Sequence, residues 1–159
     1  MKIAAITSYS LRTVAQDKVQ QTTSFQPQAV KEEETQKGPT VLFIEDDTLL
    51  LKMYKTKFEN EGFRVLTAQD GEEGLSMAKD QNIDLVILDI MMPILSGLDM
   101  LAQYRQDPKG KSVPVIILTN LTREDEMKRA RELGVKEFIV KADYTPSEVV
   151  RKIKDYLGK

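Results

Sequence analysis

The chain consists of five repeats, each an apolar segment of strand length followed by a longer segment with helical periodicity. In residues 48–61, apolar side chains recur every three or four positions, as on one face of a helix, and the pattern stops at Gly62. The predicted strands are residues 41–45, 63–68, 84–89, 113–119 and 137–141, and helices are predicted to begin near residues 48, 71, 97, 122 and 146.

The third and fourth predicted strands are apolar at consecutive positions, which is typical of strands with both faces buried. The alternation of such strands with helices indicates a parallel sheet that is covered by helices on both sides. Because crossover connections between parallel strands are right-handed, we expect an α/β fold with a doubly wound, five-stranded parallel sheet.

Two of the predicted helices begin with capping sequences. Residues 145–148, Thr-Pro-Ser-Glu, form a capping box with proline at the first helical position. In residues 122–125, Thr-Arg-Glu-Asp, we expect the Thr122 hydroxyl to accept a hydrogen bond from an amide of the first turn.

The composition changes near residue 38. Residues 20–37 contain only three apolar side chains, too few to offset the entropy cost of ordering the segment. We therefore predict a flexible N-terminal tail over residues 1–38 and one folded domain over residues 39–159. No segment has the roughly 20 consecutive apolar residues of a membrane helix, and the N-terminus is too polar for a secretory signal, so we expect a cytoplasmic protein without membrane association.

Composition excludes several kinds of chemistry. The chain contains neither cysteine nor histidine, so it has no disulfide, no Cys or His metal ligand, and no Ser-His or Cys-His catalytic pair. Any phosphohistidine that this protein uses must therefore belong to another molecule. The net charge of −2 gives no indication of a nucleic-acid-binding surface, and we expect no direct contact with nucleic acid.

Chemically useful side chains lie where the predicted strands end. In open parallel sheets, sites form beyond the carboxyl ends of the strands, at the point where the strand order reverses. If the first and third strands are neighbours, carboxylates converge there beside one hydroxyl and one ammonium. The strand ends carry Glu45, Asp46 and Asp47 (first), Asp89 (third), Thr119 (fourth) and Lys141 (fifth).

Clustered carboxylates repel one another unless a cation neutralises them. Because oxygen is the only kind of ligand atom available, a hard divalent ion fits, and Mg²⁺ is the most plausible one. A metal-bound carboxylate such as Asp89 can act as a nucleophile toward phosphorus and form an acyl phosphate. The Lys141 ammonium and the Thr119 hydroxyl would then stabilise charge on the phosphoryl oxygens.

Four segments together resemble the receiver domain of bacterial two-component response regulators. They are VLFIEDD, DLVILDIMMP, VIILTN and EFIVKAD, and they occur in this order at the ends of the expected strands. The resemblance covers residues 40–157. It implies a flavodoxin-like (βα)₅ fold with strand order 2-1-3-4-5, in which the first and third strands flank the switch point.

The resemblance also implies roles for residues of the predicted site. Asp89 would be the phosphoacceptor, with Thr119 and Lys141 holding the phosphoryl oxygens. Thr119 and Phe138 would form the conformational switch. The residue after Lys141 is Ala142, where the family usually has a proline that often follows a cis bond. A cis bond before a non-proline residue costs about 2.5–4 kcal/mol, which favours trans, and the sequence alone leaves the conformation of this bond open.

For the metal, the resemblance implies a set of four oxygen ligands. Asp46 would bind Mg²⁺ directly and Glu45 through water, with Asp89 and the backbone carbonyl of Met91 as further ligands. Asp47, which follows the two acids, is interpreted as the cap of the first helix.

The function implied is that of a stand-alone, single-domain response regulator in phosphorelay signal transduction, not an enzyme acting on a separate substrate. It would accept its phosphoryl group from a sensor histidine kinase or a phosphotransfer protein. It would then signal to an unknown downstream protein target, and we leave open a homodimer that forms on phosphorylation.

Three alternatives use the same fold. A degenerate receiver would bind partners without phosphorylation, but every expected site position is intact. A haloacid-dehalogenase-like phosphohydrolase needs a second aspartate two residues after the nucleophile, where this chain has Met91. A flavodoxin-like cofactor binder needs a phosphate-cradling first loop, whereas this loop carries the acids Glu45, Asp46 and Asp47.

Overall fold

The computed structural model describes residues 38–158 of the 159-residue chain. The prediction of a flexible tail over residues 1–38 concerns residues that lie, apart from Gly38, outside this range, so it stays a prediction. Within the described residues, no helix has the length and apolar composition that crossing a membrane requires.

Five parallel strands form one sheet in the order β2-β1-β3-β4-β5, which confirms the predicted topology. Strands β1 and β3 pair in register from Val41 opposite Leu85 to Ile44 opposite Leu88, so their carboxyl ends lie side by side in the sheet. The strands are β1 (Thr40–Ile44), β2 (Arg64–Ala68), β3 (Leu85–Leu88), β4 (Val115–Thr119) and β5 (Glu137–Val140).

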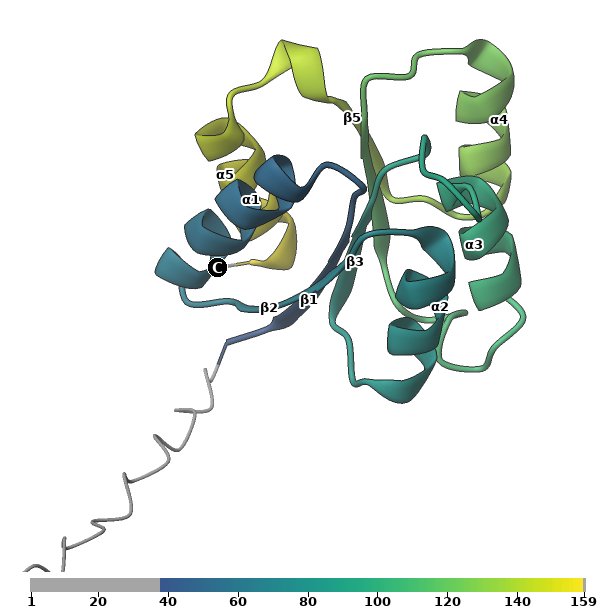
Figure 1. Ribbon diagram of the computed structural model, residues 1–159, viewed down its shortest axis with the longest axis horizontal. Coiled ribbons are helices and arrows are strands. Elements are labelled where there is room, and N and C mark those ends of the chain that lie inside the picture. The colour runs from purple at the N-terminus through teal and green to yellow at the C-terminus, as the bar shows by residue number, and fades with distance from the viewer. Residues whose placement is uncertain (1–37, 159) are drawn as a thin grey trace, which may run out of the picture. The chain divides into compact units, whose positions relative to one another are not determined.

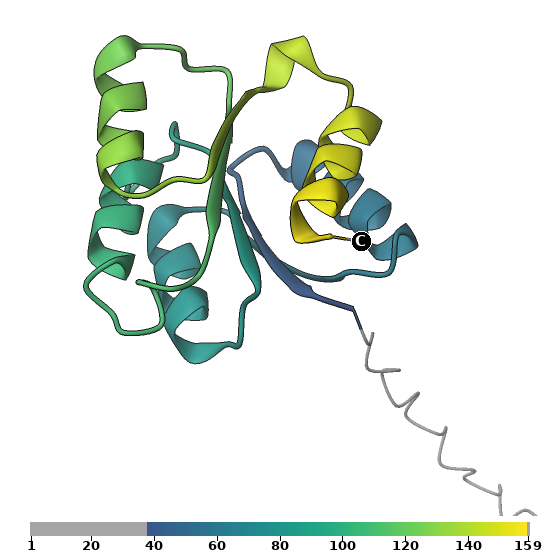
Figure 2. The same ribbon diagram turned by 180° about the vertical axis from the view of Figure 1, so that it is seen from behind.

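Five helices cover the two faces of this sheet (Figure 1). Helices α1 (Thr48–Asn60) and α5 (Pro146–Leu157) lie on one face. The view from behind shows α2 (Gly71–Asp80), α3 (Gly97–Tyr104) and α4 (Glu124–Glu132) on the other face (Figure 2). The sheet is therefore doubly wound, as predicted.

Each face of the sheet carries its own apolar core because successive side chains of a strand point to opposite faces. In β1, Val41 and Phe43 belong to the core beneath α1 and α5, whereas Leu42 and Ile44 belong to the core beneath α2, α3 and α4. All four side chains are at most 1% exposed. Full burial of such a side chain contributes about 1.5–3 kcal/mol, so the two cores hold the strand ends rigidly.

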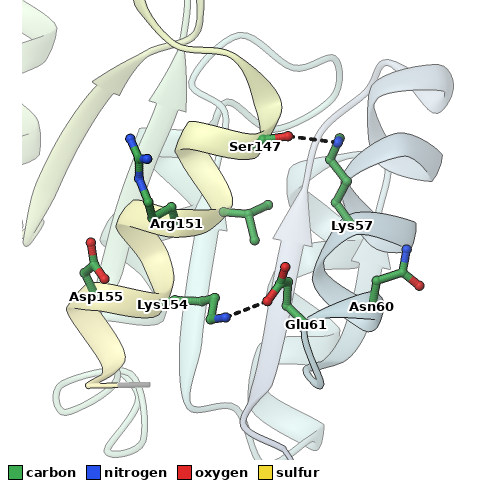
Figure 3. Close-up of a pocket in the computed structure, with 8 residues that line it drawn as sticks. Lys57, Asn60, Glu61, Ser147, Arg151, Lys154 and Asp155 are labelled. Carbon is green, nitrogen blue, oxygen red and sulfur yellow. Dashed lines mark hydrogen bonds and ion pairs between the residues drawn. The ribbon is translucent and has the colours of Figure 1, made fainter.

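Polar contacts join the outer surfaces of α1 and α5 (Figure 3). Lys57 Nζ donates a hydrogen bond to Ser147 Oγ at 3.1 Å, and Lys154 Nζ pairs with Glu61 Oε2 at 2.5 Å. These residues line a groove of about 480 Å³ between the two helices. Because an exposed pair of this kind contributes at most about 1 kcal/mol, the core beneath, rather than these contacts, holds the helices together.

The helix starts confirm one capping prediction and correct the other. At α5, Glu148 N donates to Thr145 Oγ1 at 3.3 Å and Thr145 N donates to Glu148 Oε2 at 2.7 Å, which completes the predicted capping box. At α4 the expectation for Thr122 was wrong, because the helix begins one position later and Arg123 occupies the N-cap without a side-chain hydrogen bond. The three acids of the first turn, Glu124 to Glu126, instead face the positive end of the helix dipole.

Candidate functional site

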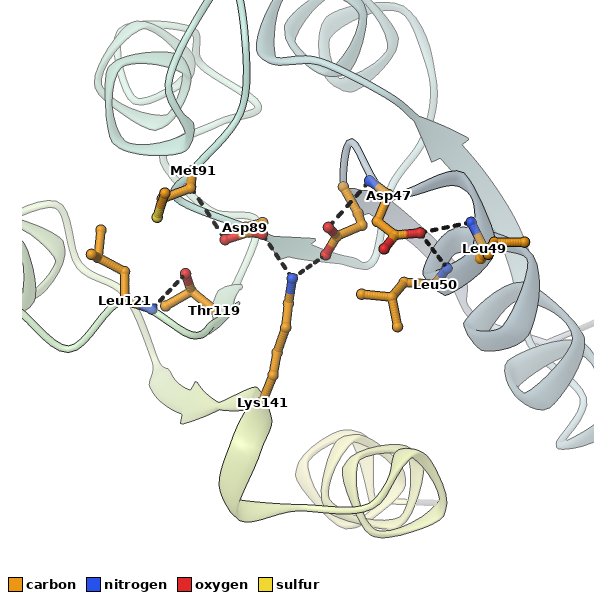
Figure 4. A network of polar contacts seen from close by, with 9 residues as sticks. Asp47, Leu49, Leu50, Asp89, Met91, Thr119, Leu121 and Lys141 are labelled. Atoms are coloured by element: carbon orange, nitrogen blue, oxygen red, sulfur yellow. Dashed lines mark hydrogen bonds and ion pairs between the residues drawn. The ribbon is translucent and has the colours of Figure 1, made fainter.

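The carboxyl ends of β1, β3, β4 and β5 contribute side chains to one polar pocket (Figure 4). Glu45 directly follows β1 and Asp89 directly follows β3, and they are only 2% and 7% exposed. The two strands remain joined at this level, because Asp89 N donates a hydrogen bond to Ile44 O at 3.0 Å. The sheet therefore fixes the backbone from which both carboxylates project.

Lys141 connects these two carboxylates. It opens a short 3₁₀ turn, Lys141–Asp143, that directly follows β5. Its Nζ donates to Asp89 Oδ2 at 2.7 Å and also to Glu45 Oε2. Burial lowers the pKa of the Lys141 ammonium, but the hydrogen bonds that it donates to both carboxylates outweigh burial, so the pKa lies above its ordinary value and the group is charged at neutral pH.

Glu45 shows the electrostatic cost of this arrangement. Burial raises the pKa of its carboxyl, and the neighbouring charge of Asp89 raises it further, against the opposing effect of the Lys141 hydrogen bond. Asp46 adds a third carboxylate at the exposed mouth of the pocket. In their ionised forms, three carboxylates and one ammonium leave an excess of negative charge, which favours the binding of a cation.

The three acids are close enough to hold a metal ion. One carboxylate oxygen from each of Glu45, Asp46 and Asp89 lies within 4.8 Å of the others. Oxygens around one octahedral Mg²⁺ are about 2.9 Å apart when adjacent and about 4.2 Å apart when opposite, so the three side chains would move closer together, or bind in part through water, to hold the ion. The donor atoms are all oxygens, and the residues present therefore fit Mg²⁺.

The second carboxylate oxygen of Asp89 is held by the backbone. Met91 N donates to Asp89 Oδ1 at 3.2 Å, so an amide fixes one oxygen while Lys141 fixes the other. Sequence reasoning missed this contact, since a backbone amide carries no sequence signal. The prediction that the Met91 carbonyl binds the metal stays a prediction.

Thr119, the last residue of β4, is 1% exposed, and Figure 4 shows its hydroxyl in the same pocket. Its Oγ1 accepts a hydrogen bond from Leu121 N at 3.2 Å, which orients the side chain. Of the side chains that the sequence placed at the four strand ends, Glu45, Asp46 and Asp89 form the carboxylate cluster, whereas Asp47 turns away to α1.

Three further residues were assigned roles from the sequence. Asp47 caps α1 as expected, with its Oδ1 accepting from Leu49 N at 2.8 Å and from Leu50 N at 3.1 Å. Residues 38–158 contain no cis peptide bond, so the bond before Ala142 is trans. Phe138 is half-buried and packs against the core beneath α2, α3 and α4, and its role as a switch stays a prediction.

The sheet order and the carboxylates at its switch point place the protein among flavodoxin-like α/β proteins with an acidic site. Comparison with known proteins identifies the family. Residues 41–154 match the model of the response regulator receiver domain. This match covers more than half of the chain, so the protein belongs to the receiver-domain family of two-component response regulators.

Individual relatives agree with this assignment. The polar-differentiation response regulator DivK of Brucella ovis is 29% identical over 119 residues, which cover 75% of this chain and 96% of DivK. A chain of the CheX-CheY-BeF3-Mg²⁺ complex from Borrelia burgdorferi is 32% identical, with a TM-score of 0.68, and the match covers 76% of this chain and 90% of that one. A CheY-like receiver domain protein from Methanospirillum hungatei is 25% identical, with a TM-score of 0.71 and coverage of 76% and 94%.

Proposed function

We propose that this protein transmits a signal by accepting a phosphoryl group on Asp89 from a phosphohistidine of a sensor histidine kinase or phosphotransfer protein. It would act in the cytoplasm and pass the signal on through contacts with other proteins. It takes part in its own phosphorylation rather than turning over a separate substrate.

The contact between Lys141 Nζ and Asp89 Oδ2, at 2.7 Å, is the observation that carries this proposal. A buried ammonium held against a buried carboxylate is in the right position to neutralise the oxygens of a phosphoryl group on that carboxylate. The surrounding charge pattern and the membership of the receiver family support the same role.

In the transfer step, an Asp89 carboxylate oxygen forms a bond to phosphorus while the bond from phosphorus to the donor imidazole nitrogen breaks. The electron pair of the broken bond stays on the imidazole, which takes up a proton from solvent. The product is an acyl phosphate on Asp89 and a neutral histidine on the donor.

Two side chains of this protein and a bound metal ion would assist the transfer. The Lys141 ammonium neutralises negative charge on one transferring oxygen, and the Thr119 hydroxyl donates a hydrogen bond to another. Mg²⁺, held by the carboxylates of Glu45, Asp46 and Asp89 and by the Met91 carbonyl, would supply further charge neutralisation. The Borrelia complex, which is described as containing BeF3 and Mg²⁺, supports this choice of metal.

Phosphorylation by a small donor tests the proposal without a partner protein. The protein is incubated with Mg²⁺ and acetyl phosphate, and the intact mass is followed over time. We expect the mass to rise by one phosphoryl group in the wild type and to stay unchanged in Asp89→Asn.

Asp84→Asn provides a matched control, because Asp84 precedes the same strand that Asp89 follows. An asparagine at this position keeps the oxygen that accepts from Thr40 N, so the variant should fold and be phosphorylated like the wild type. Phosphorylation of Asp89→Asn at the wild-type rate would refute the assignment, as would a wild type that stays unmodified.

A further inference from the structure

A second groove lies beside the candidate site, between the start of α3 and α4. It has a volume of about 540 Å³ and is here named the α3–α4 groove. Its apolar wall is formed by Met91, Met92 and Leu98, and its polar groups include Asp46 at one end and Glu126 and Arg129 of α4 at the other. A groove with an apolar wall and charged ends suits a ligand group that has both an apolar part and a charged part.

The one cation in this lining is already neutralised. Arg129 Nη2 pairs with Asp99 Oδ1 at 2.7 Å, and Ser96 Oγ donates to the other oxygen of Asp99 at 2.6 Å. The hydrogen bond from Ser96, followed by that from Arg129, lowers the pKa of the Asp99 carboxyl, so this partner is ionised at neutral pH. The charge left over in the groove is the negative charge of Glu126 and Asp46.

Glu126 has an unsatisfied oxygen. Within residues 38–158, its Oε2 is buried and accepts no hydrogen bond. By contrast, in the groove between α1 and α5, Lys57 donates to Ser147 and Lys154 pairs with Glu61 (Figure 3). A buried carboxylate oxygen without a donor is unfavourable, and a cation from outside would satisfy it.

The β3–α3 loop, which lines part of the α3–α4 groove, carries two exposed apolar side chains, of which Met91 lines the groove itself. Met91 is 61% exposed and Ile94 is 74% exposed, three residues apart in the β3–α3 loop. Ile94 has φ of 69°, the only positive φ of a non-glycine residue among those described, and this conformation is strained for a β-branched residue. Exposed apolar side chains next to a groove are characteristic of surfaces that bind proteins.

We propose that the α3–α4 groove receives a lysine or arginine side chain presented by a partner protein. The methylene stem lies along Met91, Met92 and Leu98, and the cationic head pairs with the unsatisfied oxygen of Glu126. Because the groove extends to Asp46, a partner seated there also covers the mouth of the phosphorylation site. This inference goes beyond the proposed function and does not depend on it.

A titration with a small cation tests the groove directly. The whole ¹⁵N-labelled chain is titrated with n-butylguanidinium, and n-butylurea serves as its uncharged counterpart. We expect saturable shifts of the amides of Met91, Met92 and Glu126 with the cation and none that saturate with the urea. In Glu126→Gln the affinity should fall about fivefold, as for loss of a partly screened charge pair.

Glu124→Gln is the matched control, since Glu124 lies in the first turn of the same helix, is exposed and does not line the groove. Equal weakening by both variants, equal binding of n-butylurea, or the absence of saturation would overturn the proposal. Because the titration needs no phosphoryl donor and acetyl phosphate labelling needs no partner, the two proposals fail separately. A thermal unfolding midpoint for each variant verifies that the fold is intact.

Discussion

Strand β3 has an aspartate next to each of its ends, and the two carboxylates have different environments. Asp84 precedes the strand, is exposed, and accepts a hydrogen bond from Thr40 N at 2.7 Å through its Oδ2. Asp89 follows the strand, is 7% exposed, and faces the ammonium of Lys141 at 2.7 Å. The exposed carboxylate of Asp84 accepts from a neutral backbone amide, whereas the buried carboxylate of Asp89 is paired with an ammonium.

The difference shows how the sheet separates structural acids from chemical ones. At the amino end, Asp84 links the start of β3 to the start of β1 by accepting a hydrogen bond from Thr40 N, and this contact is purely structural. At the carboxyl end, Glu45 and Asp89 share the ammonium of Lys141 and Asp46 adds a third carboxylate, so these charges are not balanced by the protein alone. We infer that the carboxyl end was built for a charged ligand and the amino end for stability.

The largest effect is expected for Asp89→Asn, which should lose phosphorylation. The next largest is a loss of Mg²⁺ affinity when a carboxylate of the cluster is replaced. The acids Asp46 and Asp47 are adjacent, but only Asp46 belongs to the carboxylate cluster. Asp46→Asn should weaken Mg²⁺ binding by a factor on the order of ten to a hundred, as expected for the loss of a charged ligand. Isothermal titration calorimetry measures this directly.

Asp47→Asn is the matched control for the metal experiment. Asparagine caps a helix about as well as aspartate, so α1 should keep its cap and the protein its Mg²⁺ affinity. If both variants lost affinity equally, the binding would reflect general negative charge at this end of the sheet rather than a defined site.

At the amino end of β3, removal of the Asp84 carboxylate should lower stability without affecting phosphorylation. Asp84→Ala leaves Thr40 N, whose residue is 8% exposed, without its acceptor. We expect the free energy of unfolding to fall by about 1–2 kcal/mol, measured by urea denaturation. Phosphorylation by acetyl phosphate should continue in this variant, and its loss would contradict the separation of the two ends.

The smallest expected effects concern the helix starts that follow the strands. Thr145→Ala removes the side-chain cap of α5 and should cost about 1 kcal/mol in urea denaturation, whereas Thr122→Ala should change stability little. Equal effects would show that Thr122 does cap α4.

Acid should weaken the same cap of α5. The hydrogen bonds from the backbone and then the side chain of Thr145 lower the pKa of the Glu148 carboxyl below its ordinary value of 4.5. The stabilisation is therefore fully present above pH 4.5 and is lost as the pH falls through the lowered pKa. Urea denaturation of the wild type and Thr145→Ala should give a difference in stability that shrinks on acidification.

The sheet and the membership of the site could be predicted from the sequence because both follow from regular patterns. Consecutive apolar residues in β3 and β4 indicated a parallel sheet, and the parallel register then placed the residues after each strand at one edge. That pattern placed Asp89, Glu45 and Lys141 at the same edge, and the strand order implied by the family resemblance made the first and third strands neighbours.

Contacts set by loop geometry could not be predicted in this way. Met91 N reaches Asp89 because of the local path of the β3–α3 loop. Helix α4 starts one residue later than predicted, so Arg123 occupies its N-cap position and the Thr122 hydroxyl does not cap it. The unsatisfied oxygen of Glu126 depends on the side-chain rotamer and on the atoms that cover it, neither of which the sequence specifies. Such features depend on backbone angles and rotamers, for which a single sequence carries little signal.

The central claim is that the carboxylate at the end of β3 becomes the acyl phosphate. After incubation with Mg²⁺ and acetyl phosphate, borohydride reduction converts a phosphorylated aspartate into homoserine, and peptide mass spectrometry locates it. We predict modification at Asp89 within the peptide that spans residues 84–93. Modification at Asp46, Asp47 or Asp84 instead, or at no aspartate, would contradict the account.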